Sequence, residues 1–368
     1  MDNARVIMLL DLDYFFAQCE ERENPSYKDK PVVICVYTRD EESGAVSTAN
    51  YIARKFGVKS GIAIKLAKRL LKDKDAVFLP VNHELYSRIS SEIMEILRSH
   101  ADQFEQVSID EAYLDVSEKV NGDFDHAEEL AREVKEDVLA KERLICSVGV
   151  GPNKLVAKIA AGYKKPDGLT MVKPVEVRDF LFPLPVGKLP GVGRKTEKVM
   201  LELGVKTIGD LANYNLESLV SVFGKALGMY FHNASNGTDE SPVQERGRAE
   251  QISRITTLKE DTRDFKSILE TLDKLSMDVH VTIMEEGLSF RSITITAVME
   301  DFKVYSRSKT LETFTSDIES IKAVSKELLE NFLKEQFKLK VRRIGVRVSS
   351  LEEATGQKHL TEFLAPEG

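Results

Sequence analysis

The chain of 368 residues has few of the features that mark membrane or secreted proteins. It has no apolar run near the ~20 residues that cross a bilayer. The charges at Asp11 and Asp13 come too early for a signal peptide. Its three cysteines, Cys19, Cys35 and Cys146, are odd in number and form no C-x-x-C pair. We therefore expect reduced, partly buried thiols in a cytoplasmic protein that does not contact a membrane.

The sequence also has no metal-binding histidine pattern and no excess of basic residues. The six histidines show no metal-ligand spacing, and a net charge of −8 argues against a uniformly basic nucleic-acid binder. A local basic surface is compatible with that total, because recognition depends on where the charges lie. At 42% hydrophobic and 30% charged residues, the length predicts about two to four domains, each with its own core.

Two short acidic segments carry most of the chemical information. One begins at Asp11 and follows the apolar run Val6–Leu10, and the other, residues 108–115, contains Asp110 and Glu111. Carboxylate oxygens are the ligands that Mg²⁺ prefers. If the three acids converge, they could hold two cations about 3.5–4 Å apart, which would activate a hydroxyl and stabilise a leaving phosphate. The alternative is that they are solvated acids at strand edges.

Residues 1–175 predict a mixed α/β fold, of the α+β class. The expected strands are 6–10, 105–108, 112–116 and 144–150, and the expected helices are 84–98 and 124–141. Their order is β-α-β-β-α-β, the split βαβ arrangement, which can place the first strand beside the hairpin. Asp11 would then lie next to Asp110 and Glu111. A further strand is expected at 32–36, and residues 36–79 are interpreted as an insertion.

The insertion contains polar residues that suit phosphate binding. Thr48, Tyr51 and Arg54 recur three apart, so a helix would place them on one face. A hydroxyl, a phenol and a guanidinium together can hold phosphate oxygens. Lys165, just before a Pro-Asp-Gly turn, is a further candidate cation. The alternative is an exposed polar helix face and a solvated lysine.

Three motifs in order, residues 11–17, 45–54 and 108–115, resemble those of Y-family DNA polymerases, closest to the archaeal form of the DinB, or polymerase IV, type. The resemblance covers nearly the whole chain. It implies DNA-directed DNA synthesis of low fidelity across lesions, with primer-template DNA and deoxynucleoside triphosphates as partners. It also implies that two Mg²⁺ ions are bound by three carboxylates and one backbone carbonyl: Asp11, Asp110, Glu111 and Leu12.

The same resemblance assigns other residues to the nucleotide. It implies that Thr48, Tyr51, Arg54 and Lys165 hold the triphosphate and that Phe16 is the steric gate against a ribose 2′-hydroxyl. Four positions would surround the nascent base pair: Val36, Ala45, Ser47 and Gly61. Because three of these four are small, the pocket has few atoms with which to reject a distorted base. Asp13 is expected to be the N-cap of the next helix, and Asp115 to end its strand.

Residues 176–238 predict a small helical thumb. Gly191-Val192-Gly193 leads into a predicted helix over 195–203 and resembles the hairpin of a helix-hairpin-helix motif. The glycines would let the backbone approach a DNA phosphate, and the N–H groups at the helix start would bind it. Gly191, Gly193 and Lys195 are therefore candidate DNA contacts. An ordinary glycine-rich helix connection is the alternative.

Residues 239–250 are interpreted as a linker, and residues 251–350 again show the order β-α-β-β-α-β. Arg343 and Arg347 share one face of the last strand, and Arg307 and Lys309 share a face of the third strand. We expect these four residues to form one basic sheet face that contacts DNA phosphates, which matches the little finger domain of the family. The alternative is a solvated sheet face.

Residues 351–368 are expected to be a flexible tail. Gln357, Leu360, Phe363 and Leu364 resemble a clamp-binding peptide, which suggests a sliding clamp similar to PCNA as a partner. We expect a monomer. Two other functions stay open from sequence: a palm-type nucleotide cyclase, which would not need the thumb hairpin or a basic C-terminal sheet, and an inactive DNA-bound scaffold, which would not need the three carboxylates.

Overall fold

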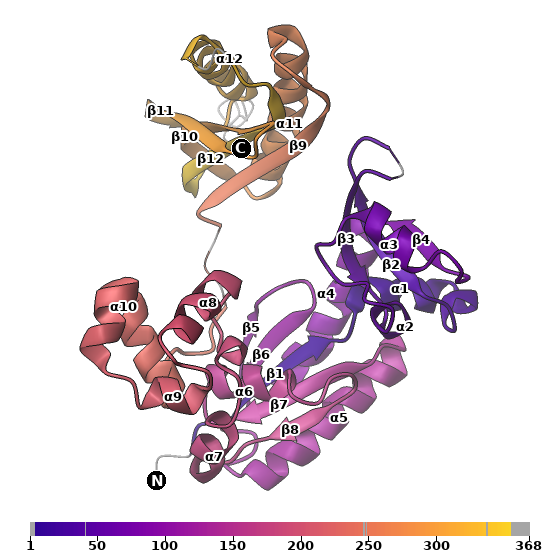
Figure 1. The fold of residues 1–368 in the computed structure, drawn as a ribbon, viewed down its shortest axis with the longest axis vertical. Helices are drawn as coiled ribbons and strands as arrows, with labels where there is room; N and C mark the ends of the chain where they lie inside the picture. The colour runs from indigo at the N-terminus through magenta and orange to yellow at the C-terminus, as the bar shows by residue number, and fades with distance from the viewer. Residues whose placement is uncertain (1–3, 41, 246, 248, 336–337, 355–368) are drawn as a thin grey trace, which may run out of the picture. The chain divides into compact units, whose positions relative to one another are not determined.

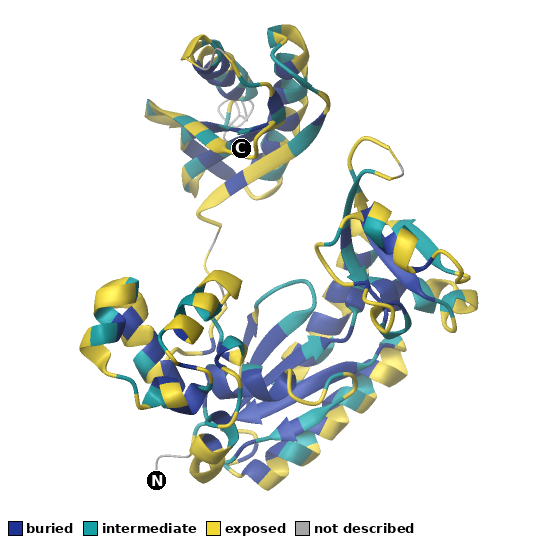
Figure 2. Ribbon diagram, in the orientation of Figure 1, coloured by how far each residue is buried: buried dark blue, intermediate teal, exposed yellow. Residues whose placement is uncertain are grey.

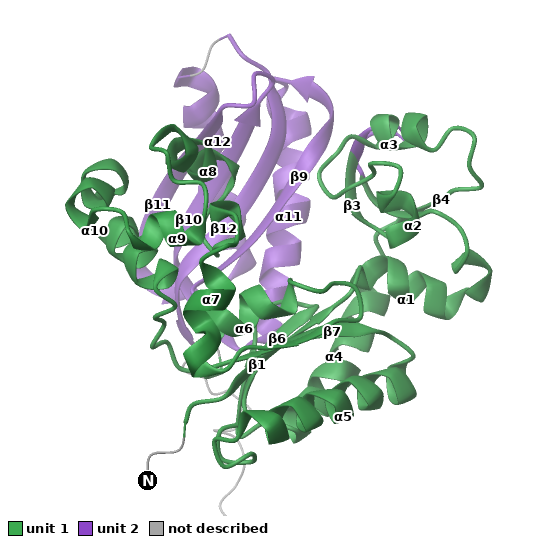
Figure 3. Cartoon of the chain, turned by 60° about the horizontal axis from the view of Figure 1, so that its bottom comes forward, with its two compact units in different colours: residues 1–36, 45–246 green, residues 37–44, 247–368 purple. Residues whose placement is uncertain are grey.

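The computed structural model describes residues 4–354, apart from residues 41, 246, 248, 336 and 337. The chain forms two compact units. One comprises residues 1–36 and 45–246, and the other comprises residues 37–44 and 247–368 (Figure 3). Helices and strands are mixed throughout (Figure 1), which confirms the predicted α/β class.

A five-stranded sheet forms the centre of the first unit. Its order is β5-β6-β1-β7-β8. The strands are β1 (Ile7–Leu12), β5 (Gln103–Gln106), β6 (Glu111–Asp115), β7 (Cys146–Gly151) and β8 (Leu169–Met171). The first four have the order of a split βαβ unit, so β1 lies between the hairpin strand β6 and β7, as predicted.

Helices cover both faces of this sheet. Met8 and Leu10 of β1 pack in one core with α4 (His83–Ser99) and α5 (Phe124–Glu142). Ile7 and Leu9 pack on the other face against α6 (Lys154–Ala161). Burial on both faces explains why β1 is apolar without alternation (Figure 2). A side chain at Gly149 would place its Cβ 2.1 Å from the carbonyl oxygen of Ala157, so the contact between β7 and α6 requires glycine there.

A smaller sheet of order β3-β2-β4 follows β1 in the chain. Its strands are β2 (Val32–Tyr37), β3 (Gly44–Ala49) and β4 (Val77–Pro80), and its helices are α1 (Phe15–Glu23), α2 (Tyr51–Arg54) and α3 (Ile64–Leu70). The small sheet therefore begins at Val32, before the start predicted for the insertion. One expectation is wrong: Thr48 lies on β3, so it does not share a helix with Tyr51 and Arg54. The helix starts only after Asn50, whose side chain accepts a hydrogen bond from the N–H of Ala53 at 2.9 Å.

Four helices follow within the first unit. They are α7 (Val177–Leu181), α8 (Arg194–Glu202), α9 (Ile208–Ala212) and α10 (Leu216–Ser235), and they share a core that includes Met200, Leu211 and Phe231. The first part of the predicted linker packs on this unit. Val243 is buried beside Ile7 and Leu9, and the carboxylate of Asp239 accepts a 3.0 Å hydrogen bond from the N–H of Leu155.

The second unit is a four-stranded sheet of order β11-β10-β12-β9 with two helices. The elements are β9 (Gln251–Thr262), α11 (Phe265–Glu285), β10 (Leu288–Met299), β11 (Val304–Thr315), α12 (Ile318–Glu335) and β12 (Val341–Glu353). Ile293 and Ile295 of β10 and Ile344 of β12 face these helices in one core. The first strand, β9, lies at an edge, whereas β1 lies inside its own sheet.

The described residues include no helix that is long and apolar enough to cross a membrane. Cys19, Cys35 and Cys146 form no disulfide with one another, as the sequence predicted, and all three are buried rather than partly buried. Burial raises the pKa of Cys146 to about 12, so this thiol is uncharged and unreactive at neutral pH.

Candidate active site

Strand pairing brings the predicted carboxylates together. Asp11 on β1 lies opposite Glu111 on β6, and the N–H of Leu12 donates a 2.9 Å hydrogen bond to the carbonyl oxygen of Asp110. The juxtaposition predicted from the order of strands is therefore confirmed, although a hundred residues separate the two segments.

Each of these carboxylates has a hydrogen-bond donor as its partner. Lys165 forms an ion pair with Asp11, and Lys158 forms one with Glu111. The hydroxyl of Ser108 donates to Asp110 at 2.5 Å. Burial raises the pKa of Asp11, and the charge of Lys165 opposes that rise. Burial therefore disfavours the charged form of Asp11, and a cation beside this carboxylate favours it.

The donor set fits a hard divalent cation. Asp11, Leu12 and Asp110 line one cavity of about 350 Å³, and carboxylate and carbonyl oxygens are the ligands that Mg²⁺ takes. Glu111 lies opposite Asp11 in the strand pairing but is not among the described residues that line this cavity. Over the described ranges, no three acidic, histidine or cysteine side chains are arranged to hold one metal ion. The ammonium groups of Lys158 and Lys165 pair with Glu111 and Asp11, whose carboxylate oxygens a metal ion would need.

The predicted phosphate-binding residues line the same cavity: Thr48, Tyr51, Arg54 and Lys165. The guanidinium of Arg54 lies 4.7 Å from the centre of the Tyr51 ring and donates to the carbonyl of Ala49 at 2.8 Å. A further bond of 3.5 Å joins it to the hydroxyl of Thr48. The fold thus gathers all four side chains at one cavity, although Thr48 comes from a strand and not from the helix that carries Tyr51 and Arg54.

Asp13 has a different place from the one expected. The N-cap of α1 is Tyr14, with φ 38°, and this helix end has no side-chain cap. Asp13 is fully buried and accepts hydrogen bonds from the hydroxyl of Ser147 at 2.9 Å, the N–H of Asp167 at 2.7 Å and the hydroxyl of Tyr51 at 3.4 Å. It therefore fixes both Tyr51 and the turn that follows Lys165. Burial of the Tyr51 phenol and the negative charge of Asp13 raise the pKa of Tyr51 to about 12. The phenol therefore keeps its proton at neutral pH and remains a hydrogen-bond donor.

Phe16 also lines the cavity, and its ring is held in place by stacking. The ring of Tyr86 lies parallel to it, with centroids 4.3 Å apart and planes 17° apart. Tyr86 is itself buried and donates a 2.7 Å hydrogen bond to Glu20. Tyr86 was not singled out from the sequence. This stacking fixes the position of the Phe16 ring at the cavity wall.

The four positions predicted to surround the base pair lie on or beside β2 and β3. Ser47 lines the cavity, together with Tyr14 and Ser60, which the sequence did not suggest. Val36 is about half exposed, and Ala45 forms an isolated antiparallel β-bridge with Ala63. Gly61 has φ 84°, and no other atom lies within 4 Å of the position that a Cβ would take there.

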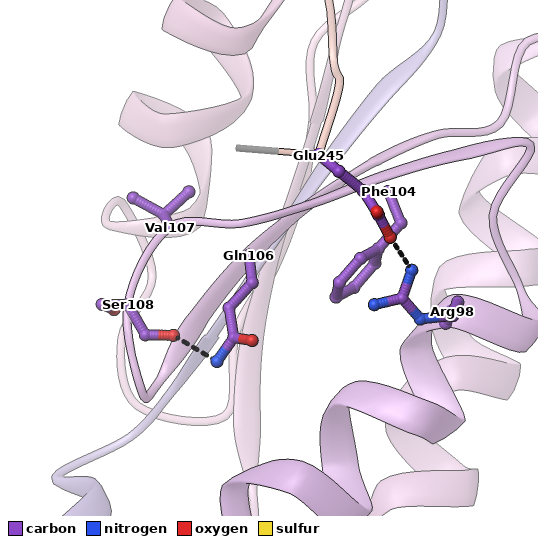
Figure 4. A pocket seen from close by; sticks show the side chains of 6 residues that line it. All are labelled: Arg98, Phe104, Gln106, Val107, Ser108 and Glu245. Atoms are coloured by element: carbon purple, nitrogen blue, oxygen red, sulfur yellow. Dashed lines mark hydrogen bonds and ion pairs between the residues drawn. The ribbon is translucent and has the colours of Figure 1, made fainter. Parts of the chain in front are cut away.

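The loop that carries Ser108 and Asp110 is braced from the opposite side. Gln106 lines a hollow of about 420 Å³ and donates a 3.0 Å hydrogen bond to the carbonyl of Ser108. Figure 4 marks this bond with a dashed line. Arg98 forms an ion pair with Glu245 and lies over the ring of Phe104 at 4.5 Å. The bond from Gln106 reaches Ser108 within the β5–β6 turn, two residues before Asp110, whereas Arg98 contacts β5 through Phe104.

The thumb hairpin has the backbone geometry that its glycines predict. Gly191 has φ 83°, and a Cβ there would lie 3.0 Å from the ring of Tyr230, which donates to the carbonyl of Pro190 at 2.8 Å. Gly193 is the N-cap of α8, so Lys195 lies in the first turn of the helix. The start of α8 therefore has open space beside Gly193, whereas the backbone at Gly191 packs against the Tyr230 ring.

The basic residues of the second unit do not form one face. Register pairs Arg307 with Ile295 and Lys309 with Ile293, which places both on the face that carries the helices. Arg307 forms an ion pair with Glu335, and Lys309 one of 2.5 Å with Glu327 on α12. The expectation of a shared basic face is therefore wrong. Tyr305 and Leu311 lie two residues before Arg307 and two after Lys309, so they share the same face of β11, and both pack against the core. These two apolar neighbours were the feature of the sequence that could have revealed this face.

Arg343 and Arg347 lie on the opposite face of that sheet. Arg347 pairs in register with Thr294, whose hydroxyl lies 2.8 Å from that of Ser308. A second hydroxyl pair, Thr296 and Ser306, lies 3.2 Å apart. The face without helices is thus rich in hydroxyl groups and carries two arginines. The candidate clamp residues, Gln357, Leu360, Phe363 and Leu364, lie outside the described residues.

Comparisons with known proteins agree over nearly the whole chain. The impB/mucB/samB family model matches residues 10–162, the C-terminal domain model of that family matches residues 249–360, and a thumb domain described for DNA polymerase-iota matches residues 187–239. The chain is 45% identical to DNA polymerase IV 1 of Methanosarcina mazei and 42% identical to DNA polymerase IV of Nitrosopumilus maritimus. Each comparison covers 98% of this chain and 99% of the relative.

Solved structures give the same result. A Y-family DNA polymerase chimera is similar at a TM-score of 0.89 with 39% identity, and the insertion ternary complex of Dbh DNA polymerase at 0.69 with 38% identity. Both cover 95% of this chain and 99% of the other. With relatives this similar along its full length, and with the carboxylates paired across β1 and β6, the chain belongs to the Y family of DNA polymerases, DinB (polymerase IV) type, and is a DNA-directed DNA polymerase that depends on divalent metal.

Proposed function

We propose that this polymerase performs low-fidelity translesion synthesis, adding deoxynucleotides to a primer with two Mg²⁺ ions held by Asp11, Asp110, Glu111 and the carbonyl of Leu12. The observation that supports the proposal is one cavity of about 350 Å³ that is lined by Asp11 and Asp110 and by the four candidate phosphate-binding side chains. When bound, the two ions would activate the primer 3′-hydroxyl and stabilise charge on the leaving pyrophosphate.

The other residues of the cavity act on the nucleotide. Thr48, Tyr51, Arg54 and Lys165 neutralise and orient the triphosphate through charge-assisted hydrogen bonds. Phe16, fixed by its stacking on Tyr86, excludes a 2′-hydroxyl by collision.

Low fidelity follows from the residues around the base pair. Ala45, Ser47 and Gly61 have few atoms with which to exclude a distorted base, and Val36 is about half exposed. This pocket would accept damaged template bases more readily than a closely fitting one.

DNA would be held through phosphates rather than bases. Gly191, Gly193 and Lys195 at the start of α8 suit one backbone phosphate. Arg343 and Arg347 suit others, and the hydroxyl-rich face around them can add neutral hydrogen bonds. Arg307 and Lys309 contribute less, because each is paired with a glutamate of α12.

The partners in this proposal are primer-template DNA and deoxynucleoside triphosphates, which the ternary complexes of the relatives also suggest. A sliding clamp would bind Gln357, Leu360, Phe363 and Leu364 in the tail. The protein would act as a monomer in the cytoplasm, a reducing compartment that suits three buried cysteines without disulfides.

Primer extension with Mg²⁺ tests the proposal directly. The full chain should extend a primer on a template, and Asp110→Ala and Glu111→Ala should nearly abolish extension without unfolding the protein. Asp115→Ala is a matched control, because Asp115 lies on the same strand but accepts hydrogen bonds from Ser117. Extension by either active-site variant at the wild-type rate would refute the assignment. Formation of a cyclic nucleotide without a primer would support the cyclase instead.

A further inference from the structure

Helix α6 places two lysines against two glutamates of the central sheet. Lys154 and Lys158 are one turn apart on the helix and pair with Glu105 and Glu111, respectively. The two pairs differ in burial. The side chains of Lys154 and Glu105 are 15% and 10% exposed, whereas Lys158 is 39% exposed. The Lys154–Glu105 ion pair is therefore shielded from solvent, whereas the ammonium group of Lys158 can leave Glu111 and remain solvated.

Space around Lys158 would allow its ammonium group to move. Lys158 lines a cavity of about 570 Å³ next to Tyr113 and Tyr230. It also lines one of about 500 Å³ beside the segment Gly187–Val192. A lysine has a flexible four-carbon stem, so it can leave Glu111 and enter either cavity without movement of the helix.

Lys158 has no part in the nucleotide chemistry described above, yet it contacts a residue proposed to bind metal. Lys165 pairs with Asp11 in the same way, but it has the triphosphate as a proposed second partner. Asp11, Asp110 and Glu111 raise one another's energy by repulsion unless a cation lies between them. An ammonium group on Glu111 relieves that repulsion and also blocks an oxygen that a metal ion would use.

We propose that Lys158 is a placeholder cation for Glu111. It stabilises the site before metal binds, competes with the metal for the carboxylate, and moves into the neighbouring cavity when the metal binds. The inference rests on the proposed function only in taking Glu111 as a metal ligand. Lys158 is thus a positioning residue, because it acts through Glu111 rather than on the nucleotide.

The test uses the full chain without DNA or nucleotide. Mn²⁺ binding is measured by electron paramagnetic resonance for wild type, Lys158→Met and, as a second variant should the first not fold, Lys158→Gln. Removing the competitor should tighten Mn²⁺ binding about threefold, the scale of a partly exposed ion pair. The same variant should melt at a lower temperature in EDTA. A residue that only supports the fold would lower the melting temperature without tightening metal binding.

Lys188→Met is the matched control, because Lys188 lines the cavity of about 500 Å³ together with Lys158. Its metal affinity should equal that of wild type. An unchanged or weaker affinity in Lys158→Met would overturn the proposal, and so would equal tightening in both variants, which would indicate a general charge effect. When Glu111 is already replaced by glutamine, Lys158→Met should leave the Mn²⁺ affinity unchanged, because the competing ion pair is already absent. Primer extension by the same wild-type preparation shows separately whether the proposed function holds.

Discussion

Replacing Arg343 and Arg347 with alanine should make DNA binding less sensitive to salt. Both side chains lie on the sheet face without helices: Arg347 is opposite Thr294, whose hydroxyl lies near that of Ser308, and Arg343 is opposite Val298. If each contacts one phosphate, the slope of log K against log salt becomes shallower by about 1.8, because one contact contributes roughly 0.9. Between about 50 and 200 mM salt, wild-type binding would then weaken ~12-fold more than binding by the variant. Fluorescence anisotropy with a labelled primer-template measures both slopes.

The structure supplies a control of equal charge. Arg307→Ala with Lys309→Ala also removes two positive charges from the same sheet, but these residues face α12 and are paired with Glu335 and Glu327. We expect its slope to stay close to that of wild type. Equal changes in both double variants would mean that long-range charge, and not the hydroxyl-rich face, governs binding. No change in the Arg343 and Arg347 variant would remove that face from the DNA contact.

Three further outcomes are expected. Phe16→Ala should raise ribonucleotide incorporation far more than it lowers deoxynucleotide incorporation, and an unchanged ratio in single-nucleotide kinetics would exclude Phe16 as the gate. Asp13→Ala should lower the free energy of unfolding by about 3 kcal/mol, because it leaves buried donors unpaired. Urea denaturation that shows a loss below about 0.5 kcal/mol would contradict this. Removing residues 357–368 should leave unassisted synthesis intact but eliminate stimulation by a loaded clamp, and equal stimulation of both forms would refute that role.

Periodicity and order along the chain were sufficient for the sheets of both units. Helical spacing in residues 84–98 predicted α4 at nearly its observed bounds, His83–Ser99. The split βαβ order then predicted that Asp11 would lie beside Glu111, because only a few strand arrangements satisfy that order. The sequence of the second unit shows the same order, yet the fold places β9 at an edge, which periodicity cannot distinguish.

The sequence by itself predicted the three carboxylates and the strand that ends at Asp11, because an apolar run followed by acidic residues is a local pattern, whereas it assigned Thr48 to a helix although this residue lies on a strand. Only the tertiary structure decided which side chains meet across strands. Alternation shows that Arg307 and Lys309 share a face, but the register of β11 against β10 decides that this face is the one with the helices. The same holds for Asp13, whose buried partners Ser147 and Asp167 come from β7 and from a turn far along the chain.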